Sequence, residues 1–222
     1  MKYYPVFLDL RRKNCLVAGG GSVAERKIRS LLAAGAKVVC VSDGFSPGIL
    51  KLSRKKNLTL RKEKIPGSPF SGWLLKNVFL VIGATSSPAV NAGIFKACRK
   101  KNILVNAVDD AGHSNFIAAS VLNRGLLSIA VSTGGASPLL AKKIRERLEK
   151  MFGPECDLFL RFMARQRQGV MARVRESGRR KKIFEALTGP KFFNLFKSAR
   201  PGTIAKKYRE ILKRHGVGKK KL

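Results

Sequence analysis

Short strand-like runs alternate with longer amphipathic stretches over the first half of the chain. The runs have four or five residues, and between them apolar positions recur three or four residues apart; the runs lie at 15–18, 37–41, 58–62, 78–82 and 103–106. Short runs bounded by turn residues are typical of buried parallel strands. Apolar residues that recur every three or four positions are typical of helices that pack one face on a sheet. The alternation predicts an α/β fold with an open, mainly parallel sheet of the Rossmann type.

The pattern changes after residue 113. Residues 116–122 and 126–132 predict two strands around a turn at 123–125, which is the signature of a β-hairpin. Ser137 and Pro138 suit the cap and the first position of a helix that runs to residue 150. Because a hairpin with one helix buries little apolar surface alone, this module is expected to form a dimer with a second copy.

The last third of the chain predicts helices only. Gly-Pro and Pro-Gly pairs separate the helices, which are expected at 157–176, 179–187, 191–198 and 203–215. Residues 65–72 (IPGSPFSG) predict a loop. The predicted domains are a Rossmann-type domain at 1–113, a β-hairpin and helix dimerisation module at 114–150, and an all-helical C-terminal domain at 151–222.

The most informative stretch is CLVAGGGSVAERKIRSLLAAGAKVVCVSD, from residue 15 to residue 43. It runs strand, glycine turn, helix, strand, acid, which is the order of a dinucleotide-binding unit. Gly19 permits the tight turn, Gly21 lets a pyrophosphate approach the backbone, and Ala24 lets the helix pack close to the strand. Asp43 is placed to bind a ribose 2′-OH and would repel the extra phosphate of NADP, so NAD+ is the expected cofactor. A glycine-rich turn in another kind of α/β protein is the alternative.

Ligands in such sheets lie beyond the carboxyl ends of the strands. Four turns meet that description, at 19–22, 42–44, 84–87 and 109–114. We therefore expect the binding site at this edge of the sheet.

The charge balance is strongly basic. The chain has a formal net charge of +33, and residues 151–222 alone hold 20 Lys and Arg against 5 Asp and Glu. Such a field attracts polyanions, which could be nucleic acid, an anionic membrane surface or a polycarboxylate substrate; an adaptation of the whole proteome to unusual conditions is the alternative. No apolar run approaches 18 residues and no signal-peptide pattern is present, so a cytoplasmic protein without membrane insertion is expected. The four Cys are widely spaced and predict neither a zinc site nor a disulfide framework.

Three segments together resemble one family. YPVFLDL with the glycine stretch, then NAVDD and SNFIAAS, then AVSTGGASPLLAKKIRERLE resemble precorrin-2 dehydrogenase, the dehydrogenase and ferrochelatase module of sirohaem synthases. The resemblance implies oxidation of the tetrapyrrole precorrin-2 to sirohydrochlorin with NAD+, and a homodimer. Some members also insert Fe2+ to give sirohaem, and the sequence leaves open whether this chain does.

The resemblance also assigns residues. It implies that Asp109 is catalytic, since a carboxylate can take the proton that oxidation releases. Further residues are candidates for contacting the substrate or supporting the site: Asp110, His113, Ser132, Thr133 and Gly134. No permanent metal site is expected; Fe2+ would be a substrate that Asp109 and His113 contact transiently.

The cofactor contacts expected from the motif and the resemblance cover three turns. They are Gly19, Gly21, Ser22, Val23, Ala24, Asp43, Gly44 and Thr85. The family's A-T-D-D turn reads Ala84-Thr-Ser-Ser87 here, so two carboxylates are missing from it. Two other functions stay open, an NAD-binding sensor without catalysis and a nucleic-acid-binding protein on a Rossmann scaffold. Few aromatic residues lie among the basic helices, so only non-specific binding of nucleic acid is expected.

Overall fold

The computed structural model describes residues 3–65 and 72–218. The chain forms two compact units, the first comprising residues up to 118 with 134–136, and the second comprising residues 119–133 with 137 onward. The loop predicted at 65–72 lies mostly outside the described residues.

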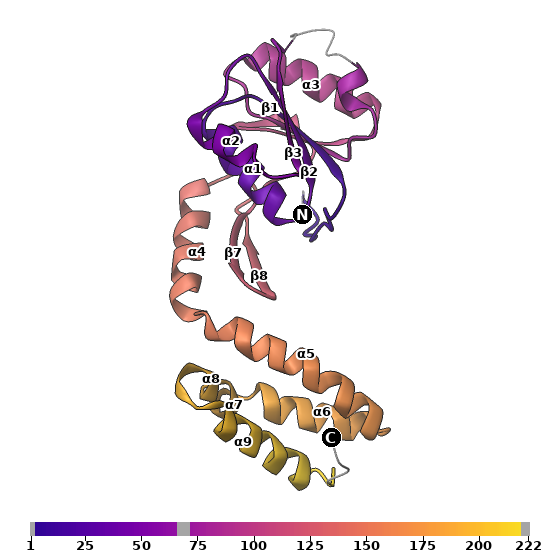
Figure 1. The fold of residues 1–222 in the computed structure, drawn as a ribbon, viewed down its shortest axis with the longest axis vertical. Helices are drawn as coiled ribbons and strands as arrows, with labels where there is room; N and C mark the ends of the chain where they lie inside the picture. The colour runs from indigo at the N-terminus through magenta and orange to yellow at the C-terminus, as the bar shows by residue number, and fades with distance from the viewer. Residues whose placement is uncertain (1–2, 66–71, 219–222) are drawn as a thin grey trace. The chain divides into compact units, whose positions relative to one another are not determined.

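The first unit contains a six-stranded sheet with the order β3-β2-β1-β4-β5-β6. Figure 1 draws this unit in indigo to magenta. Five strands are parallel and β6 is antiparallel to β5. The strands are β1 (Asn14–Ala18), β2 (Lys37–Ser42), β3 (Leu58–Lys62), β4 (Leu80–Gly83), β5 (Leu104–Ala107) and β6 (Asp110–Ser114). The strand order reverses between β1 and β4, which confirms the predicted Rossmann-type fold.

Helices cover both faces of this sheet. Alternate residues of β1 and β2, such as Cys15 and Cys40, form one apolar cluster with α1 (Ser22–Ala33) and α2 (Pro47–Leu52). The intervening residues, such as Leu16, form a second cluster with α3 (Pro88–Lys100) on the opposite face. A short 3₁₀ helix, η1 (Gly72–Leu75), precedes β4. The central strands β1, β2 and β4 are buried almost throughout, so their carboxyl ends are held between the two helical layers.

The predicted turn at 109–114 is wrong in extent. Only residues 108 and 109 form the turn, and Asp110–Ser114 is the edge strand β6. The Ser114 hydroxyl binds the backbone of Ala107, accepting from its N–H at 3.0 Å and donating to its C=O at 3.2 Å. A bulge between Asn106 and Ala107 accompanies this contact. The polar sequence DAGHS has no apolar alternation, so the strand could not be recognised from its pattern.

The second unit begins with the predicted hairpin. Strands β7 (Ser120–Arg124) and β8 (Leu127–Val131) pair antiparallel, and α4 (Pro138–Met151) packs against both. The first strand starts four residues later than predicted because the preceding segment is bound to the first unit. The Asn115 side chain accepts from Val105 N at 2.7 Å and donates to the carbonyl of Ile103 at 2.9 Å.

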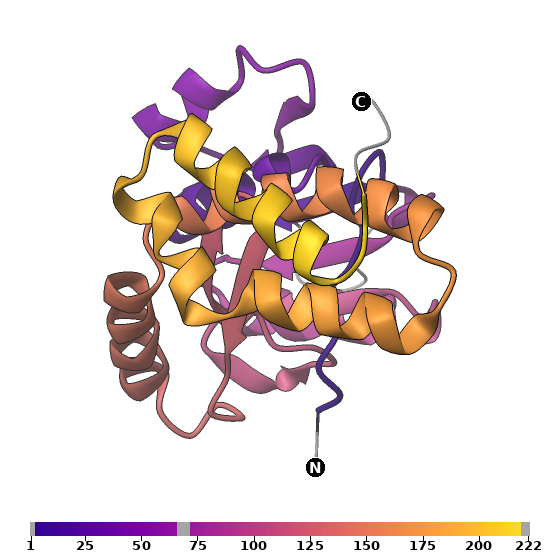
Figure 2. The ribbon, with the colours of Figure 1, turned by 90° about the horizontal axis from the view of Figure 1, so that it is seen from below.

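The helices predicted after residue 150 are present with shifted bounds. They are α5 (Glu155–Arg173), α6 (Ser177–Thr188), α7 (Pro190–Phe193), α8 (Leu195–Ser198) and α9 (Pro201–Arg214). The single helix predicted at 191–198 is two helices that meet at Asn194. Phe159 packs edge-on against Phe193 and Phe196. Helices α6 and α9 contact each other, and Figure 2 shows the helices of this part of the chain in orange to yellow. The unit therefore has its own aromatic core.

Candidate functional site

The glycine turn after β1 is held by close backbone contacts. Gly19 donates its N–H to the carbonyl of Val41 at 2.9 Å and has a φ of 120°. A Cβ on Gly19 would overlap the carbonyl oxygen of Ala84, which follows β4. The turn therefore needs glycine both for its backbone conformation and for the approach of the neighbouring strand end.

The start of α1 is open. Gly21 is the N-cap and provides no side-chain bond to the first turn, and a Cβ at this position would meet nothing within 4 Å. Ser22 is exposed, Val23 is half-buried and Ala24 is fully buried against the sheet. An uncapped helix N-terminus with free space over a glycine is the arrangement that receives a pyrophosphate, so these residues fit a dinucleotide.

The loop after β2 lies beside the glycine turn. Ser46 donates its N–H to the carbonyl of Gly20 at 2.8 Å, and Gly44 lies so close that a Cβ on Gly20 would overlap its carbonyl oxygen. Ser42 is buried and donates to Asp43 Oδ1 at 3.4 Å, while the Asp43 side chain is exposed. The structure thus brings Asp43 and Gly44 next to the glycine turn.

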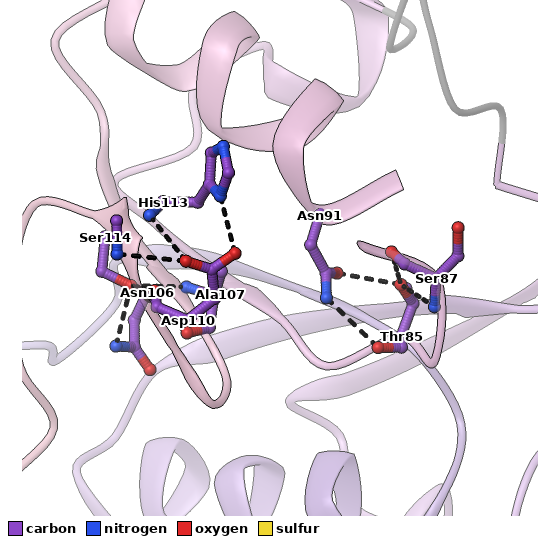
Figure 3. A network of polar contacts seen from close by, with 9 residues as sticks. Thr85, Ser87, Asn91, Asn106, Ala107, Asp110, His113 and Ser114 are labelled. Atoms are coloured by element: carbon purple, nitrogen blue, oxygen red, sulfur yellow. Dashed lines mark hydrogen bonds and ion pairs between the residues drawn. The ribbon is translucent and has the colours of Figure 1, made fainter. Parts of the chain in front are cut away.

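Thr85 stabilises the turn between β4 and α3. Its hydroxyl donates to Asn91 Oδ1 at 2.9 Å and accepts from the N–H of Ser87 at 3.3 Å, and Asn91 returns a bond to the Thr85 carbonyl (Figure 3). Ser87 caps α3 by accepting from Val90 N at 3.4 Å. The hydroxyl of Thr85 is therefore engaged within its own turn, while its backbone stands at the carboxyl edge of the sheet.

Two neighbouring aspartates have opposite surroundings. Asp110 accepts from Gly112 N at 3.0 Å, from His113 N at 3.1 Å and from His113 Nδ1 at 2.6 Å (Figure 3). The hydrogen bond from the His113 side chain is the main reason that the pKa of Asp110 lies below its usual value. The His113 ring packs edge-on against Phe95 of α3, with ring centroids 5.4 Å apart. Asp110 and His113 therefore stabilise the edge strand.

Asp109 has no such partners. It is exposed, has a φ of 60°, and receives no hydrogen bond on its carboxylate from any residue within the described ranges. The carboxylate therefore lies exposed on a two-residue turn at the carboxyl end of β5. Since β1, β2, β4 and β5 are parallel, their carboxyl ends meet at one edge, where the glycine turn, Asp43, Thr85 and Asp109 all lie.

Sequence reasoning missed Lys27 of α1. Its side chain is half-buried, and burial is the main reason that its pKa is lowered, while the charge of Asp109 acts in the opposite direction. The spacing in the sequence does indicate that Lys27 lies near the apolar side of α1, because it follows the buried Ala24 by three residues.

The loop predicted to lie near the active site follows β8. Ser132 and Thr133 belong to the second unit, and Gly134 has a φ of 66°. Thr133 Oγ1 accepts from Ser137 N at 3.0 Å, and Ser137 caps α4 by accepting from Leu140 N at 3.2 Å, as predicted for the cap. Thr133 and Ser137 thus fix the start of α4.

The buried cysteines are poor nucleophiles. Burial raises the pKa of Cys15 to about 11 and that of Cys40 to about 12. Within residues 3–65 and 72–218, no group of three or more His, Cys, Asp and Glu side chains is arranged to hold a metal ion. Over the same residues, no helix combines the length and apolarity needed to cross a membrane.

Comparisons with known proteins agree with this geometry. A family model described as "Putative NAD(P)-binding" matches residues 6–120, and one described as "Sirohaem biosynthesis protein central" matches residues 124–151. The solved structure titled "SirC, precorrin-2 dehydrogenase" superposes with a TM-score of 0.72 at 29% sequence identity, covering 96% of this chain and 99% of that one.

Two curated relatives are siroheme synthases. "Siroheme synthase 1" of Serratia proteamaculans is 34% identical over 218 residues, covering 98% of this chain and 45% of the relative. "Siroheme synthase" of Psychromonas ingrahamii is 40% identical over 189 residues, covering 85% of this chain and 39% of the relative. The chain thus spans less than half the length of these relatives.

Proposed function

We propose that this chain, which belongs to the family of NAD(P)-binding sirohaem-biosynthesis proteins, oxidises precorrin-2 to sirohydrochlorin with NAD+. The solved precorrin-2 dehydrogenase that it resembles matches it over nearly the full length of both chains. The longer synthases share only this part, so their other activities are not assigned to it.

The oxidation removes two electrons and two hydrogens from precorrin-2, one hydrogen as a hydride and one as a proton. NAD+, when bound, accepts the hydride. The residues of this chain have three tasks. The glycine turn and the N-terminus of α1 bind the pyrophosphate, Asp43 binds the ribose, and Asp109 accepts the proton from the substrate. NAD+ is favoured over NADP+ because the exposed Asp43 carboxylate would repel a 2′-phosphate.

The contrast between the two aspartates carries this proposal. Asp110 is committed to three hydrogen bonds within its own strand, whereas the carboxylate of Asp109 is exposed and receives none from the described residues. A base must reach the proton that it removes. Only Asp109 of the pair meets that condition without breaking the edge strand.

The net charge of +33 supports a polyanionic substrate. The substrate of the family is a tetrapyrrole with several carboxylates, and a basic surface would concentrate and orient it. The positive charge also favours non-specific contact with nucleic acid, which would weaken steeply with salt.

The test is turnover by Asp109→Asn under anaerobic conditions with precorrin-2 and NAD+. The variant is expected to bind NAD+ normally and to lose turnover by at least about a hundredfold, the usual contribution of a positioned base. Asp9→Asn makes the same chemical change at an exposed aspartate paired with Arg11, and it is the control. Full activity of Asp109→Asn would exclude this residue as the base. If the wild-type protein binds NAD+ without oxidising precorrin-2, the sensor function replaces the dehydrogenase.

We also propose a homodimer formed through the second unit. Apolar side chains stay exposed on its hairpin and on α4: Val121 is 44% exposed, Leu139 is 60% exposed and Leu140 is 50% exposed. Exposed apolar groups on neighbouring elements are typical of surfaces that bind another chain. A second copy of the module would bury them and would supply the core that a hairpin and one helix lack.

A further inference from the structure

The two flanks of α1 face different parts of the first unit. Ala24, Ile28 and Leu31 form its buried stripe. Glu25 lies on one flank, about 100° around the helix axis from Ala24, and Lys27 lies on the other flank, about 60° away in the opposite direction. Glu25 Oε2 accepts from Ser46 Oγ at 2.8 Å and its carboxylate lies against Gly48, so the Glu25 flank faces α2.

The Lys27 flank is the one turned away from α2. Val108, in the turn after β5, packs in the same apolar cluster as Ala24 and Ile28. The next residue is Asp109. Burial and the charge of Arg26 lower the pKa of Lys27 and the charge of Asp109 raises it, so the ammonium and the carboxylate lie within electrostatic range of each other. No direct ion pair or hydrogen bond joins Lys27 to Asp109 within the part of the chain that the structure describes, so the carboxylate oxygens stay accessible.

We propose that Lys27 is a positioning residue for Asp109. The inference rests on the proposed function, in which Asp109 is the base. An exposed carboxylate on a two-residue turn can rotate among several side-chain conformations, which direct its oxygens to different points. The half-buried ammonium attracts the carboxylate toward the N-terminal half of α1, where the cofactor is expected to bind. Lys27 exchanges no proton in this role.

The first experiment measures steady-state kinetics of Lys27→Met, Lys27→Arg and Arg26→Met. Lys27→Met is expected to lower kcat by about tenfold or more with little change in either KM, as misplacement of a reacting group does. Lys27→Arg keeps the charge and is expected to retain most of the activity. Arg26→Met removes an equal charge from the adjacent exposed position and is the matched control. An unchanged kcat in Lys27→Met, or a rise in the KM for precorrin-2 alone, would overturn the proposal.

The second experiment needs no turnover. Acetic anhydride modifies neutral amines, and mass spectrometry reports the rate at each lysine of the full chain. The Asp109 carboxylate favours the charged, unreactive form of Lys27, so Asp109→Asn is expected to raise its modification rate by about twofold or more, while Asp110→Asn leaves it unchanged. Equal rates in wild type and Asp109→Asn would contradict the electrostatic interaction between Lys27 and Asp109. Because this result does not depend on catalysis, failure of that interaction is distinguishable from failure of the proposed function.

Discussion

Substitution by alanine should destabilise the fold at Gly19 but weaken NAD+ binding at Gly21. At Gly19 the positive φ of 120° strains any side chain, and the new Cβ would overlap the carbonyl oxygen of Ala84. A left-handed backbone costs about 1–2 kcal/mol, and forcing an extra methyl group into a packed site costs about 1–3 kcal/mol. The sum, about 2–5 kcal/mol, is a large fraction of the roughly 5–15 kcal/mol that stabilises a typical domain.

At Gly21 the same substitution should spare the fold. The φ of Gly21 is −84°, which any residue adopts, and no atom lies within 4 Å of the added Cβ. Alanine is a poorer N-cap than glycine, which costs about 1 kcal/mol at most. The methyl group would instead occupy the space that the pyrophosphate needs, so the Kd for NAD+ should rise about tenfold to a hundredfold, or about 1.4–2.8 kcal/mol.

Urea unfolding followed by circular dichroism measures the free energy of unfolding, and isothermal titration calorimetry measures NAD+ binding. Gly19→Ala should lose stability, and Gly21→Ala should unfold nearly like the wild type but bind NAD+ weakly. Wild-type affinity in a folded Gly21→Ala protein would refute the assignment of this turn to the pyrophosphate. Wild-type stability of Gly19→Ala would refute the packing described for β1 and β4.

Three further outcomes are expected. Asp43→Asn should narrow the preference for NAD+ over NADP+ by about tenfold in the ratio of Kd values, because the repulsive charge is gone; an unchanged ratio would contradict the ribose contact. Asp110 has a lowered pKa, so its stabilising effect is complete above the usual aspartate pKa of about 4 and is lost as the pH falls through the folded value. The melting temperature of Asp110→Asn should therefore lie below that of the wild type at pH 7, and this difference in melting temperature should shrink in acid. A difference that does not depend on pH would contradict the hydrogen-bonded carboxylate. Glutamate at both Leu139 and Leu140 should convert a dimer into monomers in light scattering, while a wild-type monomer would contradict the dimer.

The strands and helices of the first unit could be predicted from the sequence where apolar periodicity and glycine turns occur together. The stretch from residue 15 to residue 43 has short buried runs, a helix stripe and a glycine turn, and each appears within a residue or two of its predicted place. Strand β6 was missed because its pairing depends on the Ser114 hydroxyl and the Asp110 carboxylate rather than on apolar burial. Such side-chain bonds to the backbone leave no periodic signal.

The sequence predicted which residues lie at the candidate site but not what surrounds their side chains. Motif order placed Gly21, Asp43 and Asp109 at strand ends, and parallel pairing then brings those ends to one edge. The different surroundings of Asp109 and Asp110 depend on a turn conformation that no spacing encodes. The interaction of Lys27 with Asp109 joins residues 82 positions apart in the sequence, so it requires the folded sheet.

The most direct test of the dehydrogenase function is the stoichiometry of the reaction. The purified chain is incubated without oxygen with precorrin-2 and NAD+, and NADH absorbance is followed together with the tetrapyrrole spectrum. Adding Fe2+ afterwards shows whether the chain also accelerates sirohaem formation. We predict one NADH for each sirohydrochlorin formed; no NADH from a folded protein that binds NAD+ would contradict the proposed oxidation.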